Sequence, residues 1–201
     1  MPVSLLYKNL RKRLSVLKKQ FLDFNSNYSP SPQNQDKLRA FKLLAHAEIE
    51  SYIEGVVLDI WKKCHSEWTN NKRVLPSLAF LIMYSSSKFE ANDHQLIVDM
   101  RIEQILKAYQ TLVSNNNGIM RKNILQLLMP LGIKYADIDS TWLLTINSYG
   151  SSRGHVAHTS FAVQQQLDKN DELNDLDLVL RGISKLDLRL HNLSTKLSMP
   201  F

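Results

Sequence analysis

The chain has 201 residues, of which 44% are apolar and 22% are charged, and its net charge is +6. This length and composition predict one well-buried core and exclude a disordered chain. No run of about 18 apolar residues occurs and no signal peptide is recognisable, so a membrane span and a secreted product are not expected. The one cysteine, Cys64, excludes an internal disulfide and fits a reducing, cytoplasmic location.

The first predicted element is a basic amphipathic helix over about residues 3–24. Its apolar residues recur every three or four positions, as on one face of a helix. Residues 1–25 carry six Lys or Arg side chains against Asp23 alone, a net charge of +5, whereas residues 168–177 are acidic. A basic helix attracts phosphate backbones without reading sequence. The same charges are equally compatible with a solvated face that keeps the protein soluble.

Six further helices are predicted after a loop at 25–32. Their limits come from apolar spacing, helix-capping residues and breaks at Gly, Pro and Asn. The predicted spans are about 36–64, 93–114, 119–129, 139–150, 151–166 and 171–197. The apolar segment 77–84 has no assigned type, and Asp93 is the expected N-cap of the third helix. Because no segment alternates with period two, we predict an all-α bundle of about seven helices in a single domain, residues 1–201, with its core at 36–165.

Residues 148–158, Ser-Tyr-Gly-Ser-Ser-Arg-Gly-His-Val-Ala-His, are the most informative stretch of the chain. Gly150 is predicted to end one helix, and Ser151 or Ser152 to cap the next. A helix start favours anions, because unpaired N–H groups and the helix dipole both point there. This stretch therefore predicts an anion site at a helix N-terminus.

Arg153, His155 and His158 would then lie in the first two turns of that helix. One arginine and two histidines at such a place predict a phosphate site with a proton-transfer group beside it. The alternative is a capping arginine next to two surface histidines. The sequence has no glycine-rich phosphate loop, no Cys-x-x-Cys pair and no His-Glu-x-x-His motif. The two histidines could begin a metal site, but no cysteine lies near them, so neither a metal nor a cofactor is predicted.

Arg153 and His158, with four residues between them, resemble the Arg, four to six residues, then His motif of the HEPN superfamily of ribonucleases. The branch that the chain resembles most is RiboL-PSP-HEPN. Supporting features are the helix text at 45–54, Ala-His-Ala-Glu-Ile-Glu-Ser-Tyr-Ile-Glu, the Asn-rich turn at 115–118 and the helix that carries Trp142. The resemblance covers about residues 36–165.

Two features separate this motif from an accidental match or from the family's usual form. Arg39 and His46 fit the same loose pattern, but they lie in the middle of a long helix without a terminus that could bind an anion. We interpret them as coincidental. Gly154 departs from the family, which often has a polar residue directly after the arginine; here the polar group moves one place, to His155.

The resemblance implies a metal-independent endoribonuclease, found in prokaryotic toxin–antitoxin, defence or stress systems. It implies RNA as substrate and an antitoxin or defence-complex protein as a further partner. Positions five apart on an ideal helix point about 140° away from each other. Arg153 and His158 therefore converge only if Arg153 lies at the helix end with its long side chain curling over, or if two chains contribute. The family's solution is a homodimer, which a two-fold interface would provide. A non-catalytic RNA-binding or dimerisation scaffold, or a regulatory subunit, remains the alternative.

An acidic residue from the second helix is the remaining expected member of the site. HEPN domains often place one near the arginine, to orient it or to hold a histidine in one tautomer. Glu48, Glu50 and Glu54 are the candidates. Glu50 is preferred because it fits the family's helix text best. Glu48 is second, because it shares the apolar stripe of that helix and is therefore expected to be drawn into the bundle. The alternative is that all three are ordinary solvated glutamates.

Overall fold

The computed structural model describes residues 4–24, 31–86, 98–158 and 166–195; at a few helix ends, 155–158 among them, it describes the backbone alone. These residues form seven α-helices, two short 3-10 helices and no strand. The predicted all-α class is therefore confirmed. The elements are α1 (Leu5–Phe21), α2 (Pro32–Asn71), α3 (Pro76–Ser86), α4 (Val98–Ser114), α5 (Arg121–Leu128), η1 (Met129–Leu131), η2 (Tyr135–Asp137), α6 (Ser140–His158) and α7 (Lys169–Thr195).

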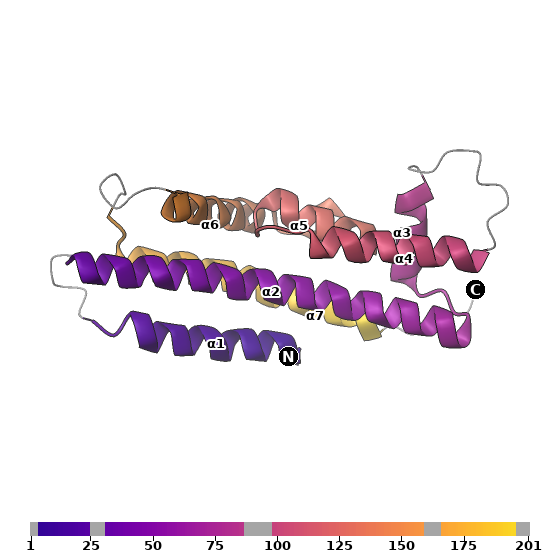
Figure 1. The fold of residues 1–201 in the computed structure, drawn as a ribbon, viewed down its shortest axis with the longest axis horizontal. Helices are drawn as coiled ribbons and strands as arrows, with labels where there is room; N and C mark the ends of the chain where they lie inside the picture. The colour runs from indigo at the N-terminus through magenta and orange to yellow at the C-terminus, as the bar shows by residue number, and fades with distance from the viewer. Residues whose placement is uncertain (1–3, 25–30, 87–97, 159–165, 196–201) are drawn as a thin grey trace.

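Helix α2 is the axis of the bundle (Figure 1). Its 40 residues span about 60 Å at 1.5 Å per residue, and all six other α-helices pack against it. In Figure 1, α1 lies along one side of α2 and α5 and α6 along the other, with α7 behind α2. The apolar residues that recur every three or four positions along this helix are all buried: Leu38, Phe41, Ala45, Ile49, Tyr52, Val56 and Ile60.

Helix α1 is fixed to the bundle by a buried carboxylate as well as by apolar packing. Asp187 of α7 is fully buried and accepts hydrogen bonds from the backbone N–H of Ser4, at 2.8 Å, and from the Tyr52 hydroxyl of α2, at 2.7 Å. The Ser4 hydroxyl in turn caps α1 by accepting from the backbone N–H of Tyr7. The predicted basic helix is therefore confirmed as an integral part of the bundle.

Most predicted helix limits agree with the structure within a few residues, and the differences have local causes. α2 begins earlier than predicted because Ser31 caps it and Pro32 takes its first position, and it ends at the left-handed Lys72. The unassigned apolar segment forms α3 behind Pro76. α7 begins two residues early because the Asp168 carboxylate accepts from the N–H groups of its first turn. The predicted cap at Asp93 lies outside the described residues.

The predicted break at Gly150 is wrong, because α6 continues through it from Ser140 to His158. A Cβ at position 150 would lie 3.1 Å from the backbone nitrogen of Met120, so the glycine is explained by a close crossing of two backbones and not by a turn. Ser152 caps no helix; its hydroxyl donates to the carbonyl of Tyr149 within the same helix. Arg153 therefore lies in the last turns of a long helix, away from any helix start.

The C-terminal ends of α1 and α6 and the N-terminal ends of α2 and α7 lie at the same end of the molecule (Figure 1). The Gln35 amide of α2 exchanges two hydrogen bonds with the backbone of Leu167, just before α7. Lys18 of α1 pairs with Asp177 of α7 at 3.4 Å. At this end α1 and α6 lie on opposite sides of α2 (Figure 1). Within the described ranges, no helix is long and apolar enough to cross a membrane.

Candidate functional site

A buried polar stripe runs along the N-terminal half of α2, beside its apolar stripe. Its residues are spaced by three or four positions and therefore share one face of the helix. Four of them are buried, and Glu50, one turn further on, keeps 17% of its side chain exposed. Burying a polar side chain costs free energy unless it is hydrogen-bonded or paired, so such residues are rare inside a bundle. The members of the stripe are Gln35, Arg39, Lys42, His46, Glu50 and Glu54.

Arg153 of α6 lies within electrostatic reach of His46, one member of this stripe. The imidazole of His46 is 2% exposed, and burial is the main cause that lowers its pKa. The carboxylate of Glu50 raises that pKa, and the guanidinium of Arg153 lowers it further. Arg153 itself is partly exposed and forms no ion pair within the described part of the chain. Among the described carboxylates, none forms an ion pair with this guanidinium.

Glu50 joins this site to the Asn-rich turn between α4 and α5. One carboxylate oxygen of Glu50 accepts the backbone N–H of Gly118, and the other lies 3.7 Å from Nδ1 of His46. Gly118 has φ +113°, a left-handed conformation that favours glycine. The preferred acidic residue thus lies between the buried histidine of α2 and the Asn-rich turn.

Glu54 reinforces the same turn. Its carboxylate accepts from the Asn116 side chain at 2.8 Å, and Asn123 holds that asparagine by donating to its carbonyl oxygen at 3.2 Å. Burial raises the pKa of Glu54, while the hydrogen bond from Asn116 opposes the rise. The two acids one turn apart on α2 therefore hold the turn that lies next to the crossing of α6.

Glu48 takes no part in this arrangement. Its carboxylate pairs with Arg13 of α1 at 2.8 Å, and its side chain is 30% exposed. The prediction that Glu48 would be drawn into the bundle is wrong, because position 48 lies at the edge of α2 that faces α1. Of the three candidate carboxylates, two face the Asn-rich turn and one faces the basic helix.

His155 and His158 lie on the continuous α6, and their side chains fall outside the described residues. Arg153 does not lie at the start of this helix, so its side chain cannot curl over that helix end toward His158. On a regular helix positions 153 and 158 point about 140° apart. His46, whose match to the motif is interpreted above as coincidental, is the histidine that the described structure brings within electrostatic reach of Arg153. The signal that could have found it is the four-residue spacing of Lys42, His46 and Glu50.

A second buried polar cluster lies one turn before Arg153. Lys42 of α2 donates to Glu172 of α7 at 2.5 Å, and both side chains are almost fully buried. The hydroxyl of Tyr149 is buried nearby, and its pKa is raised by burial and then by the charges of Glu172 and Asp175. With 3% of its surface exposed, Tyr149 offers no ring on which a base could stack.

The comparison with protein families matches residues 7–192 to the family model RiboL-PSP-HEPN. The chain belongs to the RiboL-PSP-HEPN family. The match is longer than the resemblance at 36–165, because it takes in nearly all of α1 and most of α7. No curated protein and no solved structure matches the chain.

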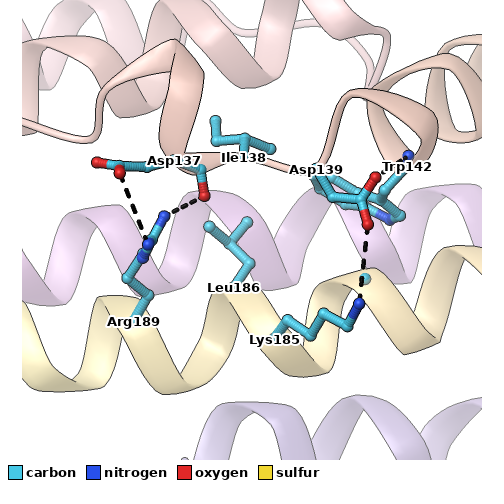
Figure 2. Close-up of a pocket in the computed structure, with 8 residues that line it drawn as sticks. Asp137, Ile138, Asp139, Trp142, Lys185, Leu186 and Arg189 are labelled. Atoms are coloured by element: carbon cyan, nitrogen blue, oxygen red, sulfur yellow. Dashed lines mark hydrogen bonds and ion pairs between the residues drawn. The ribbon is translucent and has the colours of Figure 1, made fainter.

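This RiboL-PSP-HEPN domain also has a pocket of about 250 Å³ at the other end of α6 (Figure 2). Two ion pairs line it: Arg189 with Asp137, and Lys185 with Asp139, each at 3.7 Å. Arg189 also donates to the backbone carbonyl of Asp137. Trp142, at the pocket wall, precedes Arg153 by eleven residues, or about 16 Å along the helix. The pocket is therefore separate from the Arg153 site, and its charges neutralise each other.

Proposed function

We propose that this chain is a metal-independent endoribonuclease of the HEPN type. The observation that carries the proposal is the position of Arg153. The arginine of the family motif lies within electrostatic reach of the buried His46, which has Glu50 beside it, and no described carboxylate pairs with this arginine. A guanidinium is always charged and has a planar fork that matches phosphate oxygens. Arg153 is thus suited to bind one backbone phosphate of an RNA strand.

The proposed reaction is attack of a ribose 2′-OH on the adjacent phosphorus. Neutral His158 takes the proton from the 2′-OH as the 2′-oxygen bonds to phosphorus. Arg153 offsets the charge that develops on the phosphoryl oxygens. The bond from phosphorus to the 5′-oxygen breaks, and His155 or a histidine of a second subunit gives that oxygen a proton. The products are a 2′,3′-cyclic phosphate and a 5′-OH end.

A homodimer is part of this proposal. On the continuous α6 the positions of Arg153 and His158 diverge, so a second copy of the chain supplies the most direct way to place an arginine and a histidine in one cleft. We propose a two-fold dimer on this ground and on the family resemblance. An antitoxin or another defence-complex protein would be the partner that restrains the enzyme in the cytoplasm.

The basic face of α1 is the proposed holding surface for the RNA strand. Lys19 is exposed, Lys18 is partly exposed, and both belong to the end of α1 that lies beside the N-terminal end of α7. Together with Asp23 and Lys169 they line a groove between these two helices. The C-terminal end of α6 lies at the same end of the bundle, across α2 from α1 (Figure 1), so a strand held in the groove would pass around this end to reach α6.

The test is to incubate total RNA in EDTA with the wild-type protein and with the variants Arg153→Ala and His158→Ala, and to map the ends produced. We expect wild-type cleavage that leaves cyclic phosphates and no cleavage by either variant. Cleavage that requires magnesium, or that leaves 5′-phosphate ends, would contradict the mechanism.

The second candidate function is a non-catalytic RNA-binding or dimerisation scaffold. The continuous α6 favours it, because one chain alone does not converge its arginine and histidine. A scaffold would retain RNA binding and dimerisation and would cleave nothing, and His158→Ala would leave its behaviour unchanged. Loss of RNA cleavage in His158→Ala with fold and dimer intact would exclude it.

A further inference from the structure

His46 is a buried histidine with an unsatisfied nitrogen. Its Nδ1 is inaccessible to solvent and has no hydrogen-bond partner among the described residues. The nearest carboxylate oxygen, of Glu50, lies 3.7 Å away, which is beyond hydrogen-bond distance. Leaving a buried polar nitrogen without a partner costs free energy. This cost suggests that the arrangement serves the site and not the stability of the bundle.

Glu50 is prepared to receive a proton-bearing His46. Its first carboxylate oxygen is occupied by the backbone N–H of Gly118, and the second faces Nδ1. A proton on Nδ1 would convert this near contact into a charge-assisted hydrogen bond, which is shorter and stronger than a neutral one. Arg153 opposes that proton, because its positive charge acts on the same imidazole from α6. Glu50 and Arg153 are therefore the two charged groups that decide whether His46 is protonated.

We propose that His46 is a positioning residue of the Arg153 site, which takes up a proton when an RNA phosphate binds Arg153 and then pairs with Glu50. The proposal rests on the phosphate-binding role of Arg153 proposed above. A bound phosphate offsets the charge of the guanidinium and so removes the force that opposes protonation. Because such coupling is reciprocal, a protonated His46 binds the phosphate site more tightly. The imidazole is too deeply buried to touch RNA itself and acts through Arg153 and Glu50.

The first test is a histidine NMR titration of the full chain with and without a DNA oligonucleotide. DNA carries the phosphates but lacks the 2′-OH, so it binds without being cut. The signal of His46 is identified by its absence in His46→Gln. We expect saturating oligonucleotide to raise the pKa of His46 by about 0.5, which corresponds to roughly threefold tighter binding by the protonated form. An unchanged pKa, or an oligonucleotide that does not bind, would overturn the proposal.

The second test separates this coupling from a structural role. In Arg153→Gln the pKa of His46 should rise in the free protein, and the further rise caused by the oligonucleotide should disappear. Oligonucleotide affinity should increase less on acidification in His46→Gln than in the wild type. The matched control is His65→Gln, because His65 pairs with Glu103 on the surface, nineteen residues and about 28 Å along α2 from His46.

The control should keep the wild-type pH dependence. Equal pH dependence in His46→Gln and the wild type would contradict the proposal. Neither titration requires cleavage. Absence of RNA cleavage would therefore refute the proposed nuclease activity, whereas the coupling between His46 and Arg153 would still be tested by the two titrations.

Discussion

The two ends of α6 each present an arginine, and they differ in what surrounds it. At the N-terminal end, Arg189 of α7 is paired with Asp137, and Lys185 beside it is paired with Asp139 (Figure 2). At the C-terminal end, Arg153 lies within electrostatic reach of the buried His46 and forms no ion pair in the part of the chain that is described. A neutralised cation attracts a phosphate weakly, whereas an unpaired cation near a low-dielectric interior attracts it strongly. The pocket at the N-terminal end of α6 is therefore the poorer candidate for the nucleic-acid site.

The largest expected effect is on cleavage by Arg153→Ala compared with Arg189→Ala. Removing the guanidinium that offsets transition-state charge should reduce the cleavage rate by at least about 100-fold. Arg189→Ala loses an exposed ion pair worth at most about 1 kcal/mol and should cleave at nearly the wild-type rate. Single-turnover cleavage of one RNA by the two variants makes the comparison. Equal losses in both would refute the distinction between the two ends.

The next effect is on stability at the two glycines of the motif stretch. A Cβ at position 150 would press on the backbone of Met120, whereas a Cβ at 154 meets nothing within 4 Å. Gly150→Ala should lower the free energy of unfolding by about 1–3 kcal/mol. Gly154→Ala should raise it by up to about 1 kcal/mol, because alanine favours a helix interior. Denaturant unfolding measures both. Stabilisation by both substitutions would contradict the close backbone crossing that explains the glycine at position 150.

A similar contrast holds for two glutamates on α2. Glu50→Ala leaves the N–H of Gly118 without its acceptor and should cost about 1–3 kcal/mol of stability. Glu48→Ala breaks the partly exposed pair with Arg13 and should cost less than about 1 kcal/mol. Thermal unfolding under matched conditions compares them. A larger loss in Glu48→Ala would show that the contact with α1, and not the Asn-rich turn, is the important support.

The burial of His46 predicts that the stability of the folded chain depends on pH. Burial lowers its pKa in the folded state, so below the ordinary value of about 6.5 the unfolded chain binds the proton more readily. Stability should therefore fall as the pH falls through that range. His46→Gln should lose less stability between neutral and acidic pH than the wild type does. Urea unfolding at a series of pH values measures the difference, and parallel curves would argue against a buried neutral imidazole.

The smallest effect is on the salt dependence of RNA binding. Each lysine that neutralises one phosphate contributes about 0.7 to the slope of log affinity against log salt for a single strand. Replacing Lys18 and Lys19 by alanine should flatten the slope by up to about 1.4. The matched control is Lys62 and Lys63 of α2, toward the other end of the bundle. An unchanged slope would indicate that the basic face of α1 is a solvated surface.

The sequence was sufficient to predict the helices whose apolar residues are regularly spaced, since that spacing directly reports the buried face. It was insufficient at Gly150, because the contact that requires a glycine there comes from residues 119–120, which local patterns do not reveal. The same holds for Glu48, whose partner Arg13 belongs to another helix. His46 was readable in principle from its spacing to Lys42 and Glu50. The stronger apolar stripe beside it obscured that signal.

The measurement that tests the central claim most directly uses two oligonucleotides that differ by one oxygen. Both carry the junction that the protein cuts, one with a ribose 2′-OH there and one with a deoxyribose. If Arg153 serves 2′-OH attack, the wild-type protein in EDTA cuts only the first and leaves a 2′,3′-cyclic phosphate and a 5′-OH. Arg153→Ala cuts neither. Cleavage of the deoxy junction by the wild type would contradict the account.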